Sequence, residues 1–146
     1  MVKLKKSPPT FFLFLCLMSG FIHAKNVRHL DIAQDEIHNK GRDNDKDNEE
    51  IICKLFKPNI EQISRFFRLA KQSQDFGPLE VKYSSPCIAT GAVVFQDGSA
   101  GEWMIYSSGL GYVFFKSKEL IVFFHKHNEW IDPFACTYGL GDKPEC

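Results

Sequence analysis

Two histidines at the end of an apolar run are the first residues whose spacing suggests chemistry. His125 and His127 alternate, so on a strand their imidazoles would share one face and form a plausible pair of metal ligands. A site needs at least a third ligand, which would have to come from Glu129, Asp132 or a distant histidine, and the spacing predicts no such meeting. We therefore expect two surface histidines at a strand end, and neither a metal nor another cofactor.

An acidic segment imitates the start of a calcium loop. Asp43–Asn48 places oxygen-bearing side chains on alternate residues. An EF-hand loop beginning at Asp43 requires glycine at its sixth position and glutamate at its twelfth, whereas the sequence has Asn48 and Lys54 there. We expect a solvated acidic segment at this place rather than a formed calcium site.

Carboxylates and serines are the remaining candidates for hydrolysis. Glu102, Glu119 and Asp132 could supply a pair of acids for glycosidic cleavage, but the sequence does not show that any two of them meet. The serines in Ser84-Ser85 and Ser107-Ser108-Gly109 lack the G-x-S-x-G nucleophile elbow. We interpret these serines as turn residues.

The first 24 residues have the pattern of a cleavable export signal. Lys3, Lys5 and Lys6 form a positive start, the apolar run Phe11–Met18 follows, and small or neutral residues lead to a cut after Ala24. The apolar stretch is shorter than the roughly 20 residues needed to span a bilayer, so we expect no stable membrane insertion. The sequence therefore predicts an exported protein, either periplasmic or secreted.

Four cysteines follow this signal, and an even number in an exported domain favours two disulfides. Thiol catalysis, for example by Cys87 or Cys136 with His125, would need a free thiolate that pairing removes. Three pairings are possible. We prefer one bridge between Cys87 and Cys136 and another between Cys53 and Cys146.

The charge balance argues against nucleic acid as a partner. Cleavage after Ala24 removes three lysines and no acid from a chain with 18 basic and 18 acidic residues, which leaves a net charge of about −3. Binding to phosphates usually requires a basic face. We therefore expect a partner other than nucleic acid.

The domain organisation follows from composition and hydrophobic period. Residues 25–50 are polar and predict a mobile N-terminal arm, and residues 51–146 predict one domain. A helix is expected from Asn59 to Gln72, because apolar side chains recur there on one helical face. These apolar side chains are Ile60, Ile63, Phe66, Phe67 and Ala70.

After Pro78 the apolar residues follow a strand period, and Asp97-Gly98 is a strong hairpin signal. An irregular tail is expected from Lys126. The expected fold is α+β, with one amphipathic helix packed on a four- to five-stranded antiparallel meander and stapled by disulfides. Strands are expected at residues 79–83, 88–95, 102–106, 112–115 and 120–124.

Large aromatic side chains are concentrated in the second half of the chain. Phe114-Phe115 and Phe123-Phe124 are adjacent pairs, and neighbours on a strand point to opposite faces, so both faces of the sheet should carry apolar groups. Either one face is free to contact a partner, or the arm or the tail folds over it. The candidate contact residues are Trp103, Phe115, Phe124, Trp130 and Tyr138.

These patterns favour a small exported protein-binding domain, for example an inhibitor or immunity protein acting on a toxin or a lysozyme-like enzyme. Export, size, cysteines and aromatic surface all fit a protein partner better than an enzyme. The alternatives are a small secreted hydrolase that uses paired carboxylates and a non-catalytic module of the cell envelope.

Overall fold

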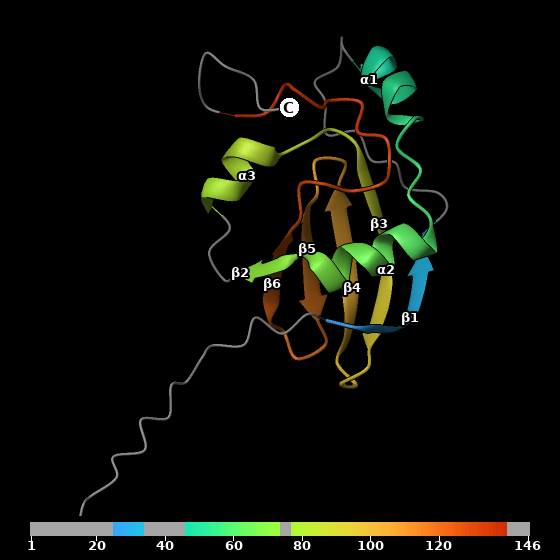
Figure 1. Ribbon diagram of the computed structural model, residues 1–146, viewed down its shortest axis with the longest axis vertical. Coiled ribbons are helices and arrows are strands. Elements are labelled where there is room, and N and C mark those ends of the chain that lie inside the picture. The colour runs from blue at the N-terminus through green and yellow to red at the C-terminus, as the bar shows by residue number, and fades with distance from the viewer. Residues whose placement is uncertain (1–24, 34–45, 74–76, 140–146) are drawn as a thin grey trace, which may run out of the picture.

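The computed structural model describes residues 25–33, 46–73 and 77–139 (Figure 1). The predicted signal, the first half of the calcium-like segment and Cys146 lie outside the described residues. Helices and strands follow one another along these segments as β1 Val27–Ile32, α1 Lys46–Cys53, α2 Ile60–Leu69, β2 Lys71–Ser73, α3 Gly77–Tyr83, β3 Ile88–Phe95, β4 Ala100–Tyr106, β5 Leu110–Phe115 and β6 Leu120–Phe124.

One antiparallel sheet holds all the strands of the described segments. Its six strands lie in the order β1-β3-β4-β5-β6-β2, so β3 to β6 form the predicted meander, and β1 and β2 extend its two edges. The α+β class is confirmed. The prediction of four to five strands and one helix is too small, because the sheet has two further edge strands and the described chain has two further helices.

Strand β1 corrects the prediction of an N-terminal arm over residues 25–50. Val27–Ile32 pairs antiparallel with β3, and Leu30 is buried in the core at 5% exposure. The strand is mostly exposed on its other residues because it lies at the edge of the sheet. A polar composition therefore concealed a strand that needs only one or two side chains in the core.

Helix α2 confirms the predicted amphipathic helix and shortens it. Its first turn is closed by a capping box, in which the Asn59 side chain accepts from the Gln62 backbone N–H and the Gln62 side chain accepts from that of Asn59, each at 2.9 Å. The helix ends at Leu69, and Lys71–Ser73 then joins the sheet beside β6. The predicted end at Gln72 is wrong because this strand pairing replaces the last turn.

Helix α3 replaces the strand predicted at residues 79–83. Pro78 lies in the first turn, where its missing N–H costs little. Leu79 and Tyr83 are four residues apart and both pack into the core, while Val81 is 67% exposed. Apolar residues at this spacing fit one helical side as well as an alternating strand, which is why the sequence pattern misled.

The larger core lies between α2 and one face of the sheet, which α2 crosses in Figure 1. The ring of Phe67 on the helix packs on those of Phe95 and Phe123, with centroids 5.4 and 5.2 Å apart. Trp103 packs over Gly91, where an added Cβ would lie 2.7 Å from the indole and 2.0 Å from a backbone oxygen of β1. This face is therefore closed by tightly packed aromatic side chains.

A smaller core covers one end of the opposite face. Tyr83 of α3 packs there on Phe124, with ring centroids 4.5 Å apart, and Phe134 and Tyr138 of the irregular tail join the same cluster. The tail thus folds over part of the second face, as one of the two alternatives from the sequence proposed. The remainder of this face, farther from α3, stays open.

One disulfide joins Cys53 at the end of α1 to Cys87 just before β3. This pairing corrects both preferred bridges, because each of them required one of these two cysteines. The end of α1 lies beside the start of β3, a meeting of distant segments that cysteine spacing does not report. Cys136 is also disulfide-bonded.

Lys25 is held firmly against the β3–β4 hairpin. Its ammonium donates to Asp97 at 2.5 Å and to Ser99 at 3.1 Å, and it lies 5.2 and 5.3 Å from the ring centroids of Phe95 and Phe115. The Lys25 hydrogen bond is the largest of the effects that hold the pKa of Asp97 well below its usual range. The ordered fold therefore includes this residue.

Candidate functional site

The predicted contact residues lie mainly inside the protein. Trp103, Phe115, Trp130 and Tyr138 are only 2–8% exposed, and Phe124 is partly buried. The exposure that the prediction assumed is therefore missing, because α2 covers one face and α3 with the tail covers part of the other. Trp130, for example, packs on Phe56 and Phe66 of the larger core.

The two histidines considered as metal ligands and expected at the surface lie just beyond β6. His125 is partly buried, which lowers the pKa of its imidazole, and its backbone N–H donates to Gly109 at 3.0 Å, whereas His127 is exposed. In the described segments no three His, Cys, Asp or Glu side chains gather as a metal site would require.

The three acids considered for hydrolysis lie on three different parts of the fold. Glu102 lies on β4 on the open part of the second face, Glu119 lies in the β5–β6 turn, and Asp132 lies in the tail. Asp132 is engaged in a network of hydrogen bonds and takes no part in the open face. A pair of catalytic carboxylates from this set has no support in this arrangement.

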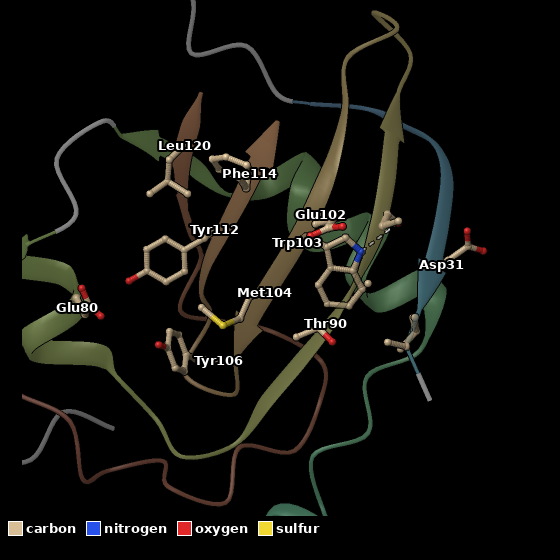
Figure 2. A pocket seen from close by; sticks show the side chains of 14 residues that line it. Asp31, Glu80, Thr90, Glu102, Trp103, Met104, Tyr106, Tyr112, Phe114 and Leu120 are labelled. Atoms are coloured by element: carbon tan, nitrogen blue, oxygen red, sulfur yellow. Dashed lines mark hydrogen bonds between the residues drawn. The ribbon is translucent and has the colours of Figure 1, made fainter. Parts of the chain in front are cut away.

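The open part of the second face forms a shallow hollow of about 910 Å³ (Figure 2). We call it the acidic hollow. Its lining comes from β1, α3 and strands β3 to β6, and consists of Asp31, Ile32, Ala33, Glu80, Thr90, Gly91, Ala92, Glu102, Trp103, Met104, Tyr106, Tyr112, Phe114 and Leu120.

The floor of the acidic hollow follows from the register of the sheet. Asp31, Ala92, Glu102, Phe114 and Leu120 are partners across five successive strands, so they form one row on one face. Phe114 is 55% exposed and Leu120 is 41% exposed. The row thus presents two carboxylates at one end and two apolar side chains at the other.

The next row of the sheet, which contains Thr90, Met104 and Tyr112, lines the rest of the hollow together with α3. Met104 pairs with Thr90 and Tyr112, and Tyr112 contacts the ring of Tyr106 at 6.0 Å. Figure 2 shows Glu80 on α3 at one end, Asp31 on β1 at the other, and Glu102 between them. The carboxylates are therefore spread along the hollow and do not form a close catalytic pair.

The electrostatics of the hollow are negative. Burial raises the pKa of the Tyr106 and Tyr112 phenols, and the charge of Glu80 raises both further. Both phenols therefore remain protonated and neutral at physiological pH. The described lining includes three carboxylates and no lysine, arginine or histidine, so the site favours a cationic group over an anionic one.

A second cluster of polar side chains lies beneath the tail. The Ser107 hydroxyl donates to Asp132 at 2.7 Å and lies 2.7 Å from the Ser85 hydroxyl, and the Tyr138 phenol also donates to Asp132, at 3.0 Å. The Trp130 indole donates to the backbone oxygen of Ser107 at 2.8 Å. Ser107 follows β4 and its partners Asp132 and Trp130 belong to the tail, so these buried bonds hold the tail against the end of the sheet.

Sequence reasoning missed Asp31 and Glu80 and chose Phe115 where the exposed ring is Phe114. The alternation of Phe114 and Phe115 did indicate that one ring faces each side, but it could not say which side α2 covers. Asp31 and Glu80 lie in segments whose strand and helix were not recognised. Once β1 is known, the pairing of Asp31 with Ala92 follows, and once α3 is known, so does the place of Glu80 near Tyr112.

In the described part of the chain, no helix has both the length and the apolar character needed to cross a bilayer. Comparison of the chain with protein-family models, with curated proteins and with solved structures finds no significant match to any of them.

Proposed function

We propose that this chain is an exported protein-binding domain whose acidic hollow binds a basic segment of a partner protein. The observation that carries the proposal is the lining of the hollow, which holds three carboxylates and the exposed apolar side chains of Phe114 and Leu120, with no basic residue among the described lining. The Cys53–Cys87 disulfide supports an oxidising compartment, and therefore export.

The row across the sheet suggests what the partner segment should carry. Glu102 stands beside Phe114, so a lysine or arginine can pair with the carboxylate while its aliphatic stem, or a neighbouring apolar residue, packs on the exposed ring. Glu80 lies at one end of the hollow and would engage a further cationic group, whereas Asp31 at the other end already lies 3.2 Å from the His29 imidazole.

The open shape of the hollow favours a protein over a small molecule. Its exposed ring and Glu102 lie on a broad sheet face, with Glu80 beside it on α3, which suits a protruding loop or extended segment of a second protein. An inhibitor or immunity protein acting on a basic toxin or a lysozyme-like enzyme fits this surface. Negative charge at the site would also speed the encounter with such a partner.

Capture from the exported proteins of the native host tests the proposal. The immobilised protein should retain one basic protein in near-stoichiometric amount, and purified samples of that protein should bind about tenfold more weakly to the Glu102→Lys variant. Binding should also weaken as salt is raised, since exposed charges are screened. If the partner is a lysozyme or a toxin, the wild-type domain should inhibit it.

The matched control is Glu50→Lys. Glu50 is exposed on α1 and is not among the residues that line the acidic hollow, so the same change in net charge occurs away from the proposed site. If both variants weaken binding equally, the loss of affinity comes from net charge and not from the acidic hollow. Unchanged binding by Glu102→Lys would exclude the acidic hollow as the contact surface.

A further inference from the structure

The edge of β1 is bordered by a hollow on each face of the sheet. The acidic hollow reaches Asp31, Ile32 and Ala33 from one side. A second hollow of about 780 Å³, the edge hollow, is lined by Leu30, Asp31, Ile32, Asn59, Ile60 and Glu61 and lies on the α2 side. The two hollows share Asp31 and Ile32, so they meet at the same stretch of edge strand.

The backbone of this stretch offers hydrogen bonds outward. Ala33 donates its N–H inward to the Thr90 oxygen at 2.9 Å, and successive residues of an antiparallel strand turn their backbone groups alternately to the two sides. The backbone N–H and C=O of Asp31 therefore point toward β3. Those of Leu30 and Ile32 point away from β3, to the outer side of the edge. Among the described strands, none pairs with this outer side of β1.

We propose that an extended segment of the partner adds to the outer edge of β1 as a further strand, over Leu30 and Ile32. This inference rests on the proposed function and specifies how the partner is held. In such strand addition, main-chain hydrogen bonds supply affinity, and alternate side chains of the added segment enter pockets on the two faces. Here those pockets are the acidic hollow and the edge hollow.

Charge and exposure define the chemistry of the added segment. The edge hollow offers Ile60, which is 54% exposed, together with the carboxylate of Glu61 and that of Asp31, which lies 3.2 Å from the His29 imidazole. Like the acidic hollow, it has no basic residue in its described lining. An added strand should therefore alternate apolar residues with lysine or arginine. At the other end of β1, the pairing of β1 with β3 changes register between Val27 and His29. This irregularity bends the strand, so regular pairing of an added segment is confined to the end near Ile32.

A synthetic peptide of seven residues that alternates lysine and valine is the probe. It is titrated into the isotope-labelled protein, expressed from its full sequence, and amide shifts are followed by NMR. We expect saturable binding with the Leu30 and Ile32 amides among those that move. Methylation of the peptide nitrogens on alternate residues should weaken binding about tenfold, because it removes the bonds to the β1 edge.

The variant Ile32→Pro removes an outward N–H and leaves the inward ladder to β3 intact, so it should also weaken binding about tenfold. Ile32→Ala is the matched control, since it shortens the side chain and keeps the N–H, and it should bind within about threefold of the wild type. If Ile32→Pro does not fold, the methylated peptide carries the same test on the unaltered protein.

The outcomes separate this inference from the proposed function. Binding that is weakened by Glu102→Lys but unaffected by methylation or by Ile32→Pro would refute strand addition and leave the acidic hollow as the contact surface. Absence of peptide binding would also refute strand addition. Slow exchange of the Leu30 and Ile32 amides in the free protein, or a dimer lost on Ile32→Pro, would show that this chain itself occupies the edge.

Discussion

Removal of the Cys53–Cys87 bridge should strongly destabilise the fold. The two residues are separated by 34 positions, and both are fully buried. The chain-entropy relation assigns about 4 kcal/mol to a closed loop of this length. Because domains of this kind have about 5–15 kcal/mol in total, the double variant Cys53→Ala with Cys87→Ala should lose a large fraction of its stability. The expected drop in melting temperature is roughly 15 °C.

Denaturation in urea without a reductant measures this effect and leaves the bridge of Cys136 untouched. The slope of unfolding free energy against urea should also rise, because an unfolded chain without the loop exposes more surface. Ile63→Val provides a control, since it makes a small cavity in the same core without changing the crosslink. A loss below about 1 kcal/mol in the double variant, with an unchanged slope, would contradict the loop-entropy reasoning.

Two further predictions concern packing and alkaline pH. Gly91→Ala should cost about 2–3 kcal/mol in thermal or urea unfolding, because its Cβ would overlap a backbone oxygen and the Trp103 ring, whereas Ala92→Ser at the exposed neighbour should be nearly neutral. Burial raises the pKa of Tyr138 from 10.0 to about 12, so stability present below pH 10 should be lost as pH rises towards 12. Tyr138→Phe should flatten that part of the stability profile, and a profile identical to the wild type would assign the loss to other groups.

The sequence was a good guide where the hydrophobic period is strong. The helical face of Ile63, Phe66 and Phe67 predicted α2, and the Asp97-Gly98 signal predicted the β3–β4 hairpin, in which Gly98 adopts a φ of 85°. The aromatic pairs predicted apolar groups on both faces. In each case one local property decided the structure, namely burial of a stripe or a turn conformation that favours glycine.

The errors arise where distant contacts decide. Strand β1 is stabilised by pairing with β3, and its own side chains are too polar to indicate a strand. The pairing of Cys53 with Cys87 depends on where α1 packs. The acidic hollow combines Asp31, Glu80 and Glu102 from three elements that are remote along the chain. No spacing rule connects these residues until the sheet order is known.

The fixed side chain of Lys25 would matter for the new N-terminus if the chain is cleaved after Ala24. If export cleaves the bond after Ala24, the newly freed amino group belongs to a residue whose side chain is already fixed between Asp97, Ser99 and two phenylalanine rings. An aminopeptidase would then have to extract this lysine before it could trim further. The maturation product should accordingly have one defined end, without the ragged termini typical of a loose leader remnant.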